Sequence, residues 1–270
     1  MGLFLCFIFT LCMSANVLFV KSSTVPAQEK LFIRLCIQFI ALLPVLQYRS
    51  TKLKVCLFGK TKESLKFLLI RGTFATMSIC CFYESIQRIP MGDASSISYC
   101  SIFFSGLIAR IWLKEPYTLM DVLFACLSVV GVVFVSKPPF IFTQLQSSQY
   151  GSTEYVGVSF AIVAAFLMGL QFTTTRKLSK TDPVLVIFYF TVVGMVLLLT
   201  LLLATNKLFM PCYSEFPNLV LVGITGLFQQ TFLVLALRYE RTTTFAVMRS
   251  TTIFQIFLLQ VSIYFFYTLL

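Results

Sequence analysis

The sequence predicts an all-α polytopic membrane protein built from about nine transmembrane helices. Apolar residues make up 58% of its 270 positions and charged residues only 11%, a balance that is unusual for a soluble domain. Runs of roughly 20 mostly apolar residues recur along the chain, and each is long enough to cross a hydrocarbon core about 30 Å thick as a helix. Most of them are too long and alternate too little to be membrane β-strands.

Polar or Pro/Gly breaks separate the nine runs. We expect the runs near residues 3–20, 31–47, 66–86, 92–113, 118–136, 155–174, 184–204, 218–237 and 242–265. The first run has no positively charged start and is followed at once by a matching run, so we interpret it as a helix rather than a cleaved signal peptide. The fourth ends at "LKEP", Leu113 to Pro116, because proline cannot continue a helix.

The distribution of Lys and Arg predicts the orientation in the membrane, because short loops rich in these residues stay in the cytoplasm. With nine spans, the loops on the side of the N-terminus hold twelve such residues and the opposite loops hold five. The N-terminus is therefore predicted to be cytoplasmic. The net charge of +11 is explained by this topology and by attraction to membrane lipids, and we expect no binding of nucleic acid.

The sequence offers no signal for catalysis, a cofactor or a metal. It contains no histidine, which removes the commonest general base and the usual zinc-site spacings. Most of the nine cysteines lie inside apolar runs, where they are interpreted as small packing residues. Phosphate loops, nucleophile elbows and metalloprotease motifs are absent from the sequence. We therefore expect neither an enzyme nor a cofactor-binding protein.

Two parts of the chain suggest an internal repeat. "SSISYCSIFFSGLIARIWL" in the fourth run can be aligned with "AVMRSTTIFQIFLLQVSIYFF" in the ninth, which sets Ser101 opposite Thr252 and Ser98 opposite Arg249. The first and sixth runs also correspond. These matches suggest two related units of five spans, which must be inverted relative to one another because five is odd. Inverted repeats are typical of secondary transporters.

The stretch "LLIRGTFATMSICCFYESIQRIPMGDASSISYCSIFFSGLIARIWLKEP", Leu68 to Pro116, is similar to the third and fourth helices of EamA-type members of the drug/metabolite transporter superfamily. "GVVFVSKPPFIF" and "ALRYERTTTFAVMRSTTIFQIF" resemble more narrowly the G branch of the solute carrier 35 family. The resemblance covers nearly the whole chain. It implies ten helices in two inverted five-helix bundles, alternating access and, in many members, dimers.

Against that pattern the chain divides into three parts. We expect a first EamA-like repeat over residues 1–136, a connecting loop over 137–154, and a second, truncated repeat over 155–270. The chain stops directly after the ninth run, so the tenth helix of the family pattern is expected to be missing.

Arg249 stands in the middle of an apolar run. An arginine inside a membrane helix costs about 2.5–3.5 kcal/mol on the insertion scale. Counted from a helix start near Thr242, its side chain is within reach of the cytoplasmic interface. Alternatively, Arg249 faces a central cavity and supplies positive charge for an anionic substrate. The resemblance implies a lysine here and an aspartate three residues later; this chain has Thr252 at that second position, so the site would be more positive.

Two further arginines are candidates for the same role. Arg34 and Arg71 stand near the starts of the second and third runs and match arginines common in EamA sequences. Each is either an interface anchor or, with Arg249, part of a positive pathway for carboxylates or phosphates.

Polar residues in the third and fourth runs complete the candidate site. Ser98 and Ser101 share one face of the fourth helix with Ser105, where they either support helix packing or line a cavity. Glu84 either pairs with Arg88 at i+4 or couples transport to protons.

Two function classes follow from these residues. The first is a secondary carrier that moves a small organic anion by alternating access. The alternative is a non-transporting, truncated membrane scaffold or regulator that binds other membrane proteins. The expected partners are a small anionic metabolite, membrane lipids and, by resemblance, a second copy of the chain. The plasma membrane and the endoplasmic reticulum or Golgi are all compatible with the sequence.

Overall fold

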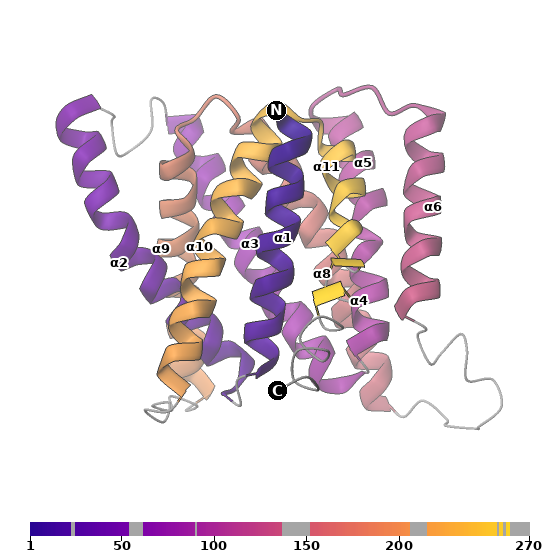
Figure 1. The fold of residues 1–270 in the computed structure, drawn as a ribbon, viewed down its shortest axis with the longest axis horizontal. Coiled ribbons are helices and arrows are strands. Elements are labelled where there is room, and N and C mark those ends of the chain that lie inside the picture. The colour runs from indigo at the N-terminus through magenta and orange to yellow at the C-terminus, as the bar shows by residue number, and fades with distance from the viewer. Residues whose placement is uncertain are drawn as a thin grey trace.

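The computed structural model describes residues 1–22, 25–53, 62–89, 91–136, 152–205, 215–252, 254–255 and 258–259. These residues form helices joined by short connections and contain no strand, which confirms the all-α prediction (Figure 1). The helices are α1 (Gly2–Ser22), α2 (Ala27–Leu53), α3 (Lys62–Arg88), α4 (Met91–Tyr99), α5 (Ser101–Trp112), α6 (Leu119–Ser136), α8 (Ser152–Lys177), α9 (Pro183–Thr205), α10 (Phe216–Tyr239) and α11 (Thr242–Arg249).

Several of these helices have the length and composition of membrane spans. Within the described residues, five are long and apolar enough to cross a membrane: α2, α3, α8, α9 and α10. Shorter apolar segments are Gly2–Val17, Ser96–Trp112 and Leu119–Gly131. Most of the predicted ninth run after α11, and nearly all of the predicted connecting loop, lie outside the described residues.

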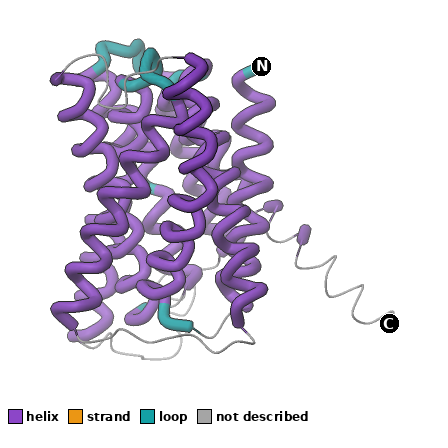
Figure 2. The backbone as a smooth tube through the Cα atoms, turned by 90° about the vertical axis from the view of Figure 1, so that its left-hand side faces the viewer, coloured by secondary structure: helices purple, strands orange, loops and turns teal. Residues whose placement is uncertain are grey.

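The helices run side by side along one direction, with their connections at two ends of the bundle (Figure 2). We call the end that holds the N-terminus the N-terminal end and the opposite end, where α1 ends and α2 begins, the far end (Figure 1). α1 packs against α10, α2 against α9, α3 against α8, and α5 against α11. Helices from the two halves of the chain are therefore interleaved rather than separated.

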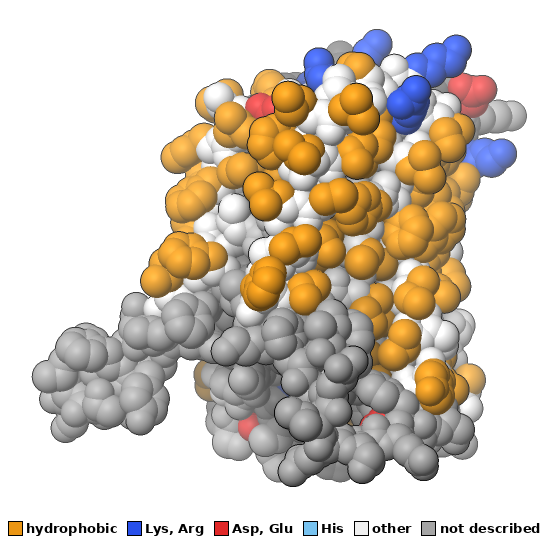
Figure 3. Space-filling view, turned by 90° about the vertical axis from the view of Figure 1, so that its right-hand side faces the viewer, with side chains coloured by type: hydrophobic (Ala, Val, Ile, Leu, Met, Phe, Trp, Pro, Cys, Tyr) orange, Lys and Arg blue, Asp and Glu red, His pale blue; other side chains and the backbone are white. Residues whose placement is uncertain are grey.

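Hydrophobic side chains cover the flank of the bundle, whereas Lys and Arg side chains gather at the N-terminal end (Figure 3). An apolar flank with the Lys and Arg side chains of the visible face gathered at one end (Figure 3) is the surface expected of a protein that crosses a bilayer.

Two helices begin at least a full turn earlier than predicted. α2 starts at Ala27 and α3 at Lys62, four residues before the corresponding apolar runs. Each first turn contains a glutamate, Glu29 or Glu63, and a carboxylate is favourable next to the exposed N–H groups of a helix N-terminus. As a result Arg34 and Arg71 lie about two turns inside their helices instead of at the ends.

The sequence predicted one continuous helix for the fourth span, but the structure divides this span into α4 and α5. α4 and α5 are separated at Cys100, whose N–H donates to Ile97 O at 3.0 Å. α11 ends in a similar way, since Ser250 N–H donates to Val247 O at 3.0 Å. Bonds of this three-residue spacing tighten a helix locally. The Ser250 hydroxyl also donates to Val247 O at 2.7 Å, and such side-chain bonds compete with the helix ladder.

Candidate functional site

A cavity of about 410 Å³ lies between helices of both halves of the chain, a volume in the range of small-molecule sites. Its wall runs from Phe9 and Phe172 in the middle of the bundle to Val20, Lys30 and Gln87 near the far end. Most of the lining surface is apolar, and a small number of polar and cationic groups interrupt it. This composition suits an organic ligand that carries a few charged groups.

Arg249 lies on the cavity wall. Its side chain is only 4% exposed, so an arginine that reaches to the membrane interface does not fit its position. Nη1 donates to Ser101 Oγ at 2.9 Å and Nη2 to Met168 Sδ at 3.4 Å. The guanidinium also lies over the rings of Tyr99 and Phe172, at 5.0 and 5.5 Å. The charge is thus held by a hydroxyl, a thioether and two aromatic faces.

Arg34 lies on the same cavity wall, although it belongs to α2. The side chain is only 5% exposed, which favours the pathway alternative over an interface anchor. Its Nη1 donates to Asn16 Oδ1 at 3.3 Å, and its Nη2 donates to Gly226 O at 3.3 Å and to Gln229 Oε1 at 3.2 Å. Nε is buried and has no hydrogen-bond acceptor among the described residues.

Arg71 is fully buried and lies behind the wall rather than on it. It donates to Thr175 Oγ1 at 3.3 Å, to Val186 O at 3.4 Å and to Gln230 Oε1 at 3.0 Å. For Arg71, too, complete burial among the helices makes an interface anchor the less favoured alternative. Gln230 does line the cavity, so Arg71 can act on a ligand only through this amide.

None of these three arginines has a carboxylate within 4 Å among the residues that the structure describes. No Asp or Glu of the described part of the chain lines the cavity. A buried charge without a counter-charge is costly, and the neighbouring dipoles and aromatic rings offset only part of the cost of burying these guanidinium groups. The cavity is therefore a positively charged, mostly apolar site.

The remaining predicted site residues lie in different places. Ser98 lines the cavity, and Ser101 supports it by accepting the hydrogen bond from Arg249. Thr252 is fully buried with its Oγ1 4.0 Å from Met13 Sδ and is not part of the lining. Glu84 pairs with Arg88 at 2.5 Å, which confirms the i+4 ion pair, and it lies outside the lining set.

Several cavity residues were not predicted from the sequence. The site is also lined by Asn16, Gln171, Gln229 and Lys30. Asn16 Nδ2 donates a hydrogen bond to Val222 O at 2.9 Å, which orients this amide. A signal for the amides was present, since Asn and Gln inside apolar runs are costly in a membrane unless they have partners. Lys30 was assigned to a loop because the start of α2 was predicted too late.

Aromatic rings and ion pairs close the bundle on the N-terminal side of the cavity. Phe245 packs against Phe9 and Phe172, with ring centroids 5.0 and 5.2 Å apart. Nearer that end, Arg176 Nε bonds to Glu115 Oε1 at 3.0 Å. Glu115 directly follows Lys114, which has a left-handed backbone (φ 56°), a strained conformation for a residue with a side chain.

A second ion pair at this end joins Arg49 to Asp182 at 2.6 Å. Both pairs link a residue of the first half of the chain to one of the second half. The third ion pair in the described residues, Glu84–Arg88, lies within α3 near the far end.

Comparisons with known proteins agree with this architecture. The EamA-like transporter family model matches residues 1–137. The chain is 29% identical over 269 residues to solute carrier family 35 member G1 of Mus musculus, covering 98% of this chain and 72% of that protein. It is 25% identical over 229 residues to the pseudopaline exporter CntI of Pseudomonas aeruginosa, covering 84% and 74%. A crystal structure with 16% sequence identity superposes with a TM-score of 0.78, over 98% of this chain and 88% of the other.

These matches agree with the resemblance found from the sequence. With the apolar helices described above, they make the protein a multi-pass integral membrane protein whose named relatives are transporters rather than enzymes. Because the family model covers half of the sequence, the chain belongs to the EamA-like transporter family.

Proposed function

We propose that this protein is a secondary transporter that moves a small organic anion across the membrane by alternating access. The observation that carries the proposal is the pair Arg34 and Arg249, which are buried on the wall of one cavity with no carboxylate partner among the described residues. An anionic ligand would supply the missing counter-charge and gain charge-assisted hydrogen bonds from both guanidinium groups. Arg71 would contribute through Gln230.

Packing between the halves of the chain supports two inverted repeats over residues 1–136 and 155–270. If α8 to α11 repeat the first four spans, then the first span of each unit packs on the third span of the other, as α1 does on α10 and α3 on α8. Likewise, the second spans of the two units pack on each other, as α2 does on α9, and so do the fourth spans, as α5 does on α11. Reciprocal packing of this kind is what a pseudo-twofold axis requires.

The local breaks support the same proposal. Cys100 and Ser250 interrupt the fourth span of each proposed unit at nearly aligned positions. Arg249 of one break donates to Ser101 of the other. Interrupted helices at the repeat interface are typical of transporter substrate sites.

The proposed orientation places the N-terminal end in the cytoplasm, supported by the cations gathered there (Figure 3). The cavity extends to the far end, and Phe245 and the two ion pairs between the halves lie on the other side of it. We therefore interpret the structure as a state closed to the cytoplasm. Proton coupling through Glu84 remains a hypothesis beside its ion pair with Arg88.

A flux assay on the purified full chain in liposomes tests the proposal. We expect uptake of labelled organic anions, and Arg249→Gln should lower it by about tenfold or more, since hydrogen bonds to a charged group contribute about 1.5–3 kcal/mol. Arg110→Gln is the matched control, because Arg110 is an exposed cation of α5 outside the cavity. Folded protein without flux of any anion would favour the non-transporting scaffold, and normal flux by Arg249→Gln would contradict the proposed site.

A further inference from the structure

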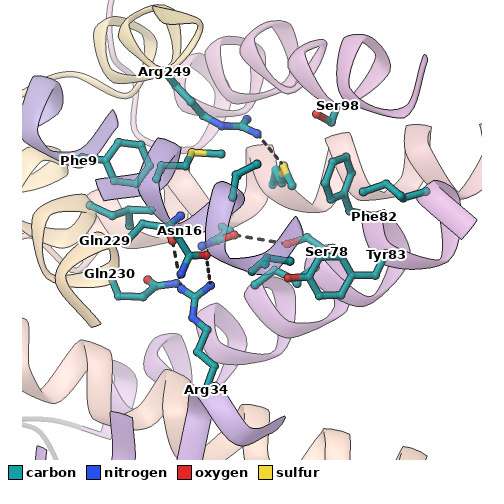
Figure 4. Close-up of a pocket in the computed structure, with 18 of the residues that line it drawn as sticks. Phe9, Asn16, Arg34, Ser78, Phe82, Tyr83, Ser98, Gln229, Gln230 and Arg249 are labelled. Atoms are coloured by element: carbon teal, nitrogen blue, oxygen red, sulfur yellow. Dashed lines mark hydrogen bonds between the residues drawn. The ribbon is translucent and has the colours of Figure 1, made fainter. Parts of the chain in front are cut away.

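Arg34 and Arg249 approach the cavity from opposite walls. In Figure 4, Arg34 rises from α2 on one side, Arg249 descends from α11 on the other, and both guanidinium groups point into the space between them. We propose that the substrate carries two acidic groups, one at each end of an apolar middle segment, and that each acidic group binds one of these arginines. This inference rests on the proposed function and narrows its substrate class.

The Arg34 end is an amide-lined site. Asn16 and Gln229 each present a side-chain oxygen to the guanidinium, at 3.3 and 3.2 Å. The two amides orient the group without neutralising it, since both are uncharged. Arg34 Nε packs against Gly226 of α10 and has no acceptor among the described residues, so the guanidinium keeps its full charge at the site. A carboxylate or phosphate is the group that such a donor set accepts.

The Arg249 end is built differently but has the same sign. Its hydrogen-bond partners are the hydroxyl of Ser101 and the thioether of Met168. A thioether is a weak acceptor, so an anion could replace it at little cost. The aromatic faces of Tyr99 and Phe172 hold the guanidinium in place from the side. Arg249 is therefore positioned before the ligand arrives, which reduces the entropy lost on binding.

The space between the two ends is mainly apolar. Its lining includes Ile79, Phe82, Met168 and Leu233. A ligand with a hydrocarbon or aromatic middle segment would therefore bury that segment favourably. No carboxylate of the described residues lines the cavity, and an ammonium group on the ligand would lack a counter-charge. These features favour a bis-anion over a monoanion or a zwitterion.

A matched series of probes tests the inference. The probes are α,ω-dicarboxylates of increasing chain length, each paired with its monomethyl ester, presented to the full chain in liposomes. We expect an optimum chain length at which the diacid is taken up at least about tenfold better than its monoester, which can pair with only one arginine. Arg34→Gln and Arg249→Gln should each remove this preference, and Arg110→Gln should keep it.

The outcomes separate this inference from the proposed function. Equal uptake of diacid and monoester at every length would overturn the bis-anion inference and leave anion transport intact. If no probe is taken up, thermal unfolding of the purified protein decides, because a ligand raises the melting temperature according to its affinity. Selective stabilisation by a diacid over its monoester would then support the inference without transport, and equal or absent stabilisation would overturn it.

Discussion

The two ends of the helical bundle are joined in different ways. At the N-terminal end, Arg176–Glu115 and Arg49–Asp182 connect the first half of the chain to the second, and Phe245 packs against the cavity residues Phe9 and Phe172. At the far end, the ion pair of the described residues stays within α3, and the cavity reaches this end. The ion pairs that the described residues form between the two halves thus lie where the bundle is closed, and these pairs would have to break for the cavity to open to the other side.

Removing the aromatic packing at the closed end should have the largest effect. Phe245→Ala deletes a fully buried ring and should lower the free energy of unfolding by about 3–5 kcal/mol through lost packing and the cavity left behind. Thermal or steric-trap unfolding in detergent measures the loss. Phe124→Ala is the matched control, since Phe124 is 52% exposed on α6. Equal losses in both variants would show that Phe245 does not hold this end closed.

A smaller effect is expected at the wall of the cavity. A Cβ atom at Gly226 would collide with the Arg34 guanidinium and the Gln38 amide, so Gly226→Ala should displace Arg34 and cost about 1–3 kcal/mol. The variant should also bind organic anions more weakly, as measured by the ligand-dependent shift in melting temperature. In the control Gly131→Ala, the new Cβ meets no atom within 4 Å, and stability should stay equal or rise slightly. Unchanged anion binding in Gly226→Ala would contradict the assigned role of Arg34.

The smallest effect is expected for the ion pairs, and it distinguishes the two ends directly. A double-mutant cycle with Glu115→Gln and Arg176→Gln should give a coupling energy of about 1 kcal/mol, because both side chains are mostly shielded from solvent, 15% and 22% exposed. The same cycle with Glu84→Gln and Arg88→Gln should give about 0.3–0.5 kcal/mol, as for an ordinary helix pair. Thermal unfolding of the four variants and two double variants measures both values. A larger coupling energy for Glu84–Arg88 than for Glu115–Arg176 would show that the ion pair at the far end is the stronger one, contrary to this prediction.

Much of the fold could be predicted because membrane insertion acts on each segment separately. The apolar runs located the helices, and the i+4 spacing identified the Glu84–Arg88 pair. Errors arose where polar residues extend a helix, as at the starts of α2 and α3. Since the apolar pattern does not record those extra turns, Arg34 and Arg71 were placed too close to the starts of their helices and Lys30 was placed in a loop.

The candidate site could be predicted only in part. Arg249 was singled out because a charge in an apolar run is conspicuous, but its hydrogen bonds to Ser101 and Met168 depend on the packing of α11 beside α5 and α8. Asn16 and Gln229 were missed, because the pattern of one helix does not show which neighbouring helix faces its polar residues.

By itself the sequence determined that the chain forms apolar helices, which family it belongs to, and which end carries most of the cations. These properties follow from the bilayer, whose thickness and lack of hydrogen-bonding partners constrain each segment independently. Only the tertiary structure decided that Arg34 and Arg249 share one cavity while Arg71 and Thr252 lie outside it. That outcome depends on how each helix is rotated and offset against its neighbours, which is set by contacts between segments far apart in the chain.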